Sequence, residues 1–119
     1  MRQLLLLGFG FMPVIVQADI IKCSFTEPFI TTVYSTNTST LTVIYDAERR
    51  RETLNNISFQ IMKPATFELW DAKRRVVQRL DLSFRGSDGM SDRVYPYEAH
   101  WLTKNLHGGC TSNHLRVRP

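Results

Sequence analysis

The stretch TLTVIY, Thr40 to Tyr45, places apolar Leu41, Val43 and Tyr45 at every second position. A period of two predicts a β-strand, because successive strand side chains point to opposite faces of a sheet. The same alternation recurs in three further segments: Ile57–Ile61, Phe67–Trp70 and Leu80–Phe84. Outside the first 18 residues, no segment sustains the spacing of three and four residues that predicts a helix. The sequence therefore predicts an all-β protein.

Turn-forming residues separate these segments. Asn55-Asn56 interrupts the chain before Ile57, and Asp71 to Arg74 is expected to turn it from Trp70 into Val76. About seven short strands in roughly 100 residues, separated by such turns, predict a small antiparallel barrel or sandwich.

The first 18 residues have the pattern of a secretory signal peptide. A positive start at Met1 and Arg2 precedes an almost wholly apolar run from Leu4 to Val16, and cleavage is expected after Ala18. The run is shorter than the roughly 20 residues that span a bilayer, so no transmembrane segment is expected. We expect a signal peptide at 1–18, one all-β domain at 19–119, and a periplasmic or secreted location.

The chain has two cysteines, Cys23 and Cys110, one near each end of the expected domain. An even number of cysteines in an exported chain favours a disulfide over a reactive thiol. The bridge would tie the first strand to the last, and so help to close a barrel or pin its edges. In the chain-entropy model a loop of this length stabilises the fold by roughly 4 kcal/mol.

The formal net charge is +4 at pH 7, which is mildly basic. The two basic runs, 49–51 and 73–75, lie between alternating apolar segments, where solvated turns are expected. Since no broad basic face is evident, nucleic acid is not expected as a partner.

The stretch GSDGMSDRVYPY, Gly86 to Tyr97, is the most unusual in composition. Turn chemistry explains its glycines and its proline, but not the joint presence of hydroxyl, carboxylate and guanidinium groups. One reading is a rigid loop, in which Asp88 or Asp92 accepts backbone N–H bonds or pairs with Arg93. The others are a contact with a protein or ligand, and a cation site. The spacing lacks the closing Glu of the twelve-residue calcium loop, which argues against the cation.

Three motifs carry a resemblance to a known family: TEPF at 26–29, DGMSDRVYP at 88–96 and GGC at 108–110. In this order the chain resembles an uncharacterised family of small bacterial envelope proteins and lipoproteins with EPFW-like, DGMSD and YP, and final GC motifs. The resemblance implies a Gram-negative cell envelope, but no established activity. It also implies a shared site if Glu27 and the DGMSD segment meet in space.

The chain departs from the family at two positions. Ile30 stands where a Trp is common, and Gly86 where a cysteine is frequent. If that cysteine normally bridges to the final one, the resemblance implies that the partner of Cys110 has moved to Cys23.

We expect an exported, non-catalytic binding or structural module that acts on an envelope protein or a cell-wall component, with no cofactor and no bound metal. The candidate binding residues come from the two longer motifs: Glu27, Asp88, Ser91, Asp92, Arg93 and Tyr95.

Two other classes of function remain open. The layout also resembles that of periplasmic inhibitors of C-type lysozyme, although a partner of a basic lysozyme should be acidic. A small metal-binding or enzymatic domain is the second alternative. His100, His107 and His114 could act as ligands or bases, but their spacing matches no zinc site.

Overall fold

A computed structural model of the chain describes residues 20–26 and 29–113. The prediction of an all-β protein is confirmed, but the strand count was wrong, since the sheet has nine strands rather than about seven. The strands are β1 (Ile20–Phe25), β2 (Ile30–Ser35), β3 (Thr40–Tyr45), β4 (Arg50–Leu54), β5 (Ser58–Lys63), β6 (Thr66–Trp70), β7 (Val76–Gly86), β8 (Tyr95–Trp101) and β9 (Leu106–Ser112). A single 3-10 turn, η1 (Asp46–Glu48), is the one helical segment in the described part of the chain.

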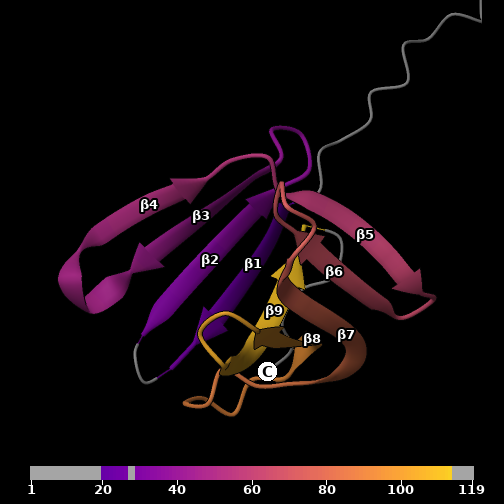
Figure 1. The fold of residues 1–119 in the computed structure, drawn as a ribbon. Helices are drawn as coiled ribbons and strands as arrows, with labels where there is room; N and C mark the ends of the chain where they lie inside the picture. The colour runs from indigo at the N-terminus through magenta and orange to yellow at the C-terminus, as the bar shows by residue number, and fades with distance from the viewer. Residues whose placement is uncertain (1–19, 27–28, 114–119) are drawn as a thin grey trace, which may run out of the picture.

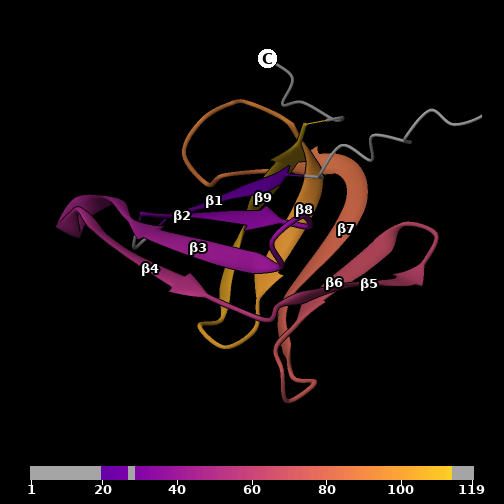
Figure 2. The same ribbon diagram turned by 90° about the horizontal axis from the view of Figure 1, so that it is seen from above.

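All nine strands form one antiparallel sheet in the order β4-β3-β2-β1-β9-β8-β7-β6-β5. The first and last strands pair at its middle, with β2–β4 on one side and β5–β8 on the other (Figure 1). The sheet curls strongly, so that these two wings face each other (Figure 2).

The sheet is a half-barrel and not the closed barrel or two-sheet sandwich that the sequence predicted. Its two edge strands, β4 and β5, follow each other in the chain but do not pair. Between them Ile57 is anchored twice by its backbone, because its N–H donates to the Ser39 carbonyl and its carbonyl accepts the Tyr34 hydroxyl. One strand pairing is therefore missing from an otherwise continuous meander.

The extra strands have weak sequence signals. In β4 the sequence RRETL is exposed at four of its five positions, so it lacks the apolar alternation of a half-buried strand. In β2 a buried threonine, Thr32, occupies an inward position where an apolar residue is expected. The predicted turn from Asp71 to Arg74 is confirmed, and the segments on its far side merge into the single 11-residue strand β7.

The predicted disulfide between Cys23 and Cys110 is confirmed. The two residues lie directly opposite each other on β1 and β9, with Cα atoms 4.0 Å apart. The expectation that the bridge pins the edges of the sheet was wrong, because β1 and β9 are its central pair.

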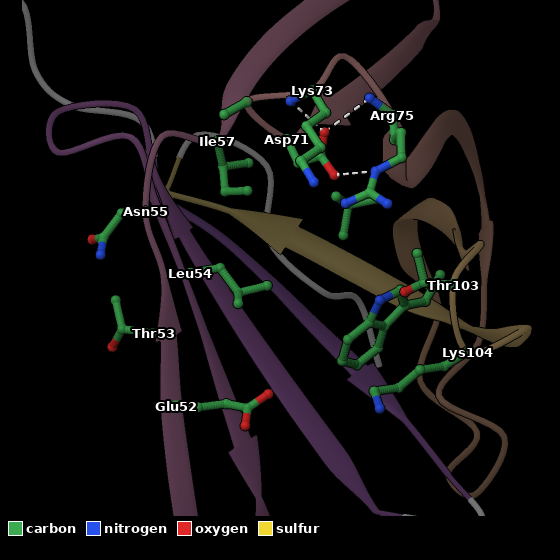
Figure 3. Close-up of a pocket in the computed structure, with 13 residues that line it drawn as sticks. Glu52, Thr53, Leu54, Asn55, Ile57, Asp71, Lys73, Arg75, Thr103 and Lys104 are labelled. Atoms are coloured by element: carbon green, nitrogen blue, oxygen red, sulfur yellow. Dashed lines mark hydrogen bonds and ion pairs between the residues drawn. The ribbon is translucent and has the colours of Figure 1, made fainter.

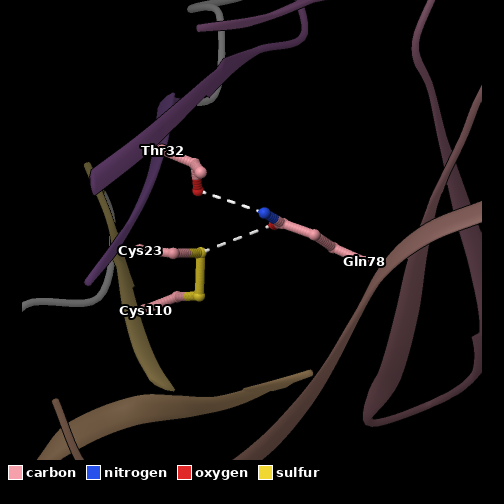
Figure 4. The surroundings of a disulfide bond; sticks show 4 residues. All are labelled: Cys23, Thr32, Gln78 and Cys110. Carbon is pink, nitrogen blue, oxygen red and sulfur yellow. Dashed lines mark hydrogen bonds between the residues drawn. A yellow bond between two sulfur atoms is a disulfide. The ribbon is translucent and has the colours of Figure 1, made fainter. Parts of the chain in front are cut away.

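Buried Gln78 on β7 reaches across the interior to the disulfide (Figure 4). Its Nε2 donates to Thr32 Oγ1 at 3.2 Å, and its Oε1 lies 3.8 Å from Cys23 Sγ. That second contact is not a hydrogen bond, since a disulfide sulfur carries no hydrogen. The polar groups of β2 and β7 thus meet across the curled sheet.

Aromatic side chains join the two wings at one place. The ring of Phe59 on β5 stacks on Tyr34 of β2 and on Phe67 of β6, with centroids 6.4 and 5.3 Å apart. Phe67 then meets the edge of the Tyr97 ring at 6.1 Å. Such contacts add stability beyond the apolar area that they bury. They therefore hold β5 and β6 against β2 and β8 across the inside of the curled sheet.

The expected signal peptide at 1–18 lies outside the described residues. Of the residues that are described, none belongs to a helix with the length and hydrophobicity needed to cross a membrane.

Candidate functional site

The loop between β7 and β8 is organised by the carboxylate of Asp88. Its Oδ1 accepts the backbone N–H groups of Met90 and Ser91, both at 2.8 Å. Its Oδ2 accepts the Ser91 hydroxyl at 2.8 Å and the Tyr95 hydroxyl at 3.1 Å. Hydrogen bonds to the charged form lower a carboxyl pKa. The Ser91 backbone N–H is the largest cause, and the pKa of Asp88 falls to about 2.

The predicted site residues of this loop divide into two groups. Ser91 and Tyr95 both donate to the Asp88 carboxylate, so the hydrogen bonding expected of at least one aspartate is found at Asp88. Asp92 and Arg93 are exposed, and within the described part of the chain their side chains form no hydrogen bond or ion pair. Burial raises the pKa of Tyr95, and its hydrogen bond to Asp88 acts in the same direction.

The three sequence motifs converge at this end of the sheet. Gly89 has φ +83°, and a Cβ there would lie 2.4 Å from Thr26 Oγ1. A Cβ on Gly109 would lie 2.6 Å from Cγ of Tyr95. Both distances are too short for a side chain, so the glycines allow the DGMSD loop to pack against the TEPF and GGC segments. Glu27, the remaining predicted residue, lies outside the described residues.

A shallow hollow of about 180 Å³ lies between the first two motifs, beside Asp88 and Thr26. Phe29 and Met90 line it and are 46% and 68% exposed. This hollow is small compared with the roughly 300 to 1,000 Å³ of sites that hold small ligands.

A larger cleft, of about 510 Å³, opens where the sheet does not close (Figure 3). One wall is β4 with the link to β5, and the opposite wall is formed by the β6–β7 and β8–β9 turns. Its apolar lining consists of Leu54, Ile57, Val77 and Trp101 together with Ala72. Leu54 points into the space between the walls. Concave, mostly apolar sites with a few polar groups are typical ligand sites.

Both acidic residues of the cleft rim already have partners. Asp71 Oδ1 accepts the backbone N–H groups of Lys73 and Arg75, and its Oδ2 pairs with Arg75 Nε, each at 2.9 Å. These bonds, led by the Arg75 backbone N–H, lower the pKa of Asp71. Across the cleft, the two oxygens of Glu52 accept from Tyr45 and Arg50 at 3.1 and 3.3 Å.

Two lysines of the rim, unlike these carboxylates, have no ion-pair partner among the described residues. The Lys104 ammonium lies 5.4 Å from the ring centre of Trp101 and 5.8 Å from that of Tyr45. Among the described residues neither Lys104 nor Lys73 pairs with a carboxylate. The rim therefore carries positive charge that its own carboxylates do not offset.

Trp101, in the wall of the cleft, is 2% exposed. Its indole Nε1 is the one buried side-chain nitrogen or oxygen in the described part of the chain without a hydrogen-bond partner. An unmet buried donor costs about 1 to 3 kcal/mol.

Sequence reasoning missed this cleft. Its residues come from β4, from two turns and from the ends of β7 and β8, with no motif in common. Only the absence of pairing between β4 and β5 brings them to one opening, and a sequence pattern does not reveal that.

The histidines proposed as ligands or bases lie elsewhere. His100 and His107 face each other on β8 and β9, and their rings stack 4.3 Å apart. His100 Nε2 also bonds to Asn105 Oδ1 at 3.1 Å, and His114 is outside the described residues. Within the ranges that the structure describes, no three His, Cys, Asp or Glu residues are placed to hold a metal ion.

Comparisons with protein-family models, with curated proteins and with solved structures gave no match to this chain.

Proposed function

We propose that the chain is an exported, non-catalytic binding module of the bacterial cell envelope, and that its ligand occupies the cleft beside β4. The observation that carries this proposal is the opening of about 510 Å³ with an apolar lining and a charged rim, at the one place where the meander lacks a strand pairing. A closed sheet would have no such opening, so the missing pairing is where the fold departs from its simplest form.

The site proposed here differs from the one expected at the DGMSD loop. There the Asp88 carboxylate already accepts four hydrogen bonds from within its own loop and from Tyr95. A carboxylate so occupied has little capacity left for a partner, which favours a structural role for the loop. Asp92 and Arg93 remain exposed and available to an envelope protein.

Binding at the cleft can be tested with Nile red, a neutral apolar dye that fluoresces when it leaves water. We expect saturable binding of one dye per chain, and a loss of at least about ten-fold in affinity in Leu54→Arg, which places a charge in the apolar lining. Ile61→Arg is the matched control, since Ile61 is 69% exposed on β5 and does not line the cleft. An equal loss in both variants, or no binding by the parent protein, would refute the cleft as the site.

The exported location is supported by the buried disulfide, because such bonds persist in oxidising compartments. The test is the mass of the protein recovered from the periplasm or the medium of a Gram-negative host. A chain that begins at Asp19 and contains no free thiol is expected. Recovery of an unprocessed chain in the cytoplasm would contradict the proposal.

The lysozyme-inhibitor alternative has less support, because Asp88, one of the two aspartates of the loop that would enter a lysozyme cleft, is bound within its own loop. A lysis assay with a C-type lysozyme decides the matter. Inhibition at submicromolar concentration that Asp92→Ala relieves would favour the alternative over the cleft.

A further inference from the structure

We infer that the cleft ligand is a single-chain amphiphile with a carboxylate head, in which the hydrocarbon chain lies on the apolar lining and the carboxylate lies beside Lys104. This inference rests on the proposed function, since it names the ligand class of the same cleft.

The first step concerns the hydrocarbon part. Leu54, Ile57 and Val77 offer the ligand no hydrogen-bonding side chain. Trp101 lies in the wall behind this lining, since it is only 2% exposed. Burial of apolar ligand surface on such a lining is favourable in proportion to the area removed from water. A volume of about 510 Å³ lies in the lower half of the range for small-ligand sites, which favours one chain over two.

The second step concerns the sign of the head group. The rim has three basic residues, Lys73, Arg75 and Lys104, against two acidic ones. Arg75 is paired with Asp71, and Glu52 accepts from Arg50 and Tyr45, so the ammonium groups of the two lysines are left. An anion is therefore attracted to this rim, and a cation is repelled.

The third step concerns where the head lies. Figure 3 shows Lys104 and Glu52 on opposite walls, with Leu54 on the same wall as Glu52. The Lys104 ammonium is held over the Trp101 ring at 5.4 Å, at the border between the apolar lining and solvent. A carboxylate there would meet a cation whose position is already restricted, which lowers the ordering cost of binding.

The buried Nε1–H of Trp101 adds a hydrogen-bond donor to the same wall. An oxygen acceptor on the ligand, brought within reach by a small shift of the residues that cover this atom, would satisfy it. A trimethylammonium head has no acceptor and could not.

The experiment compares three ligands that share a twelve-carbon chain and differ in the head: dodecanoate, dodecanol and dodecyltrimethylammonium. Each is titrated as a monomer against the Nile red complex, below the micelle concentration of the two ionic ligands and below the solubility limit of dodecanol. Direct binding is measured by calorimetry. We expect dodecanoate to bind about ten-fold more tightly than the cationic ligand, with dodecanol between them. The advantage of dodecanoate should shrink as salt is added.

Two charge-reversal variants locate the head group. In Lys104→Glu we expect the preference between dodecanoate and the cationic ligand to be lost or inverted. Lys63→Glu makes the same change of charge at the far end of β5, outside the cleft, and should leave the preference unchanged. Both lysines lie in or beside turns, and circular dichroism with a thermal melt verifies that each variant folds.

The outcomes separate this inference from the proposed function. Binding of Nile red without any preference for dodecanoate, or a preference that survives Lys104→Glu, overturns the inference and leaves the cleft as a binding site. If Nile red also fails to bind, the proposed function fails with it.

Discussion

The Asp71 turn precedes strand β7 and the Asp88 loop follows it, and the same hydrogen-bonding arrangement holds both. In each, one carboxylate oxygen accepts two backbone N–H groups that follow it in the chain, at 2.8 to 2.9 Å. In each, the pKa of the aspartate is lowered as a result. The two segments differ in the hydrogen-bond partners of the second carboxylate oxygen.

The second oxygen of Asp71 pairs with Arg75, which is four residues further on and well exposed, so among the residues that the structure describes this carboxylate bonds only within its own turn. The second oxygen of Asp88 also accepts from Tyr95 on β8, and the adjacent Gly89 packs against Thr26. The Asp88 loop is thus fixed to strand β8 and to the segment that follows β1, whereas the Asp71 turn borders an open cleft. The same hydrogen-bonding pattern therefore anchors the loop after β7 to the rest of the fold, whereas before β7 it holds a turn that forms part of the cleft rim.

The largest loss of stability is expected from removal of the disulfide. This bond joins β1 and β9, the strands beneath the Asp88 loop, and not the strands beside the Asp71 turn. Replacement of Cys23 and Cys110 by Ala should lower the free energy of unfolding by about 4 kcal/mol. Denaturant unfolding measures this loss, and hydrogen exchange shows where it acts. The amides of the Asp88 loop should lose more protection than those of the Asp71 turn. Equal losses would contradict the claim that the disulfide supports the Asp88 loop more than the Asp71 turn.

The next effect is expected from Asp88→Asn. The amide keeps one acceptor oxygen but loses the charge that strengthens four hydrogen bonds, so stability should fall by about 1.5 to 3 kcal/mol. Asp92→Asn is the matched control in the same loop. Because Asp92 is exposed, that change should stay within about 0.5 kcal/mol. Thermal melts that show equal losses would contradict the division of roles between the two aspartates.

Acid should remove the contribution of Asp88 without any substitution. Its folded pKa, about 2, is lower than the ordinary value of 3.8, so its stabilisation is complete above pH 3.8 and is lost as the pH falls through 2. After allowance for its partial exposure, this amounts to about 1 to 2 kcal/mol. The stability difference between the parent protein and Asp88→Asn, measured by urea unfolding, should shrink between pH 4 and pH 2. A stability difference that stays constant between pH 4 and pH 2 would contradict the lowered pKa of Asp88 as the source of this stabilisation.

The smallest effect on stability is expected from Asp71→Asn, because within the described ranges the Asp71 side chain bonds only to residues of its own turn. Its main consequence should be on binding. Release of Arg75 adds an unpaired cation to the rim, which should tighten binding of dodecanoate by about two- to five-fold. Calorimetry tests this, with Asp88→Asn expected to leave the affinity unchanged. The opposite result, in which Asp88→Asn alters binding and Asp71→Asn does not, would reverse the roles of the two ends of β7.

The sequence predicted what depends on local pattern. The alternation of Leu41, Val43 and Tyr45, the turn at Asp71 and the disulfide were all recognisable because each rests on neighbouring residues or on composition. The exposed strand β4 was missed, since its charged sequence lacks an apolar face.

The sites were less predictable than the fold. Composition marked the DGMSD loop, but only the three-dimensional structure distinguishes Asp88, which is hydrogen-bonded, from Asp92, which is exposed. The cleft could not be predicted, because the missing pairing between β4 and β5 depends on how far the whole sheet curls. Long-range geometry of that kind has no local signature.

The central position of the disulfide has a mechanical consequence. Cys23 and Cys110 are 87 positions apart in the chain, yet they are joined directly. A force that pulls the two ends apart would therefore pass through the sulfur atoms and leave the segment from β2 to β8 unloaded. Only the short flanking parts of β1 and β9 could peel away, so the extension under load would be a small fraction of the chain's contour length until the bond is reduced. After reduction of the disulfide, the same force would act on the segment from β2 to β8 as well, and the whole domain could then unfold and extend.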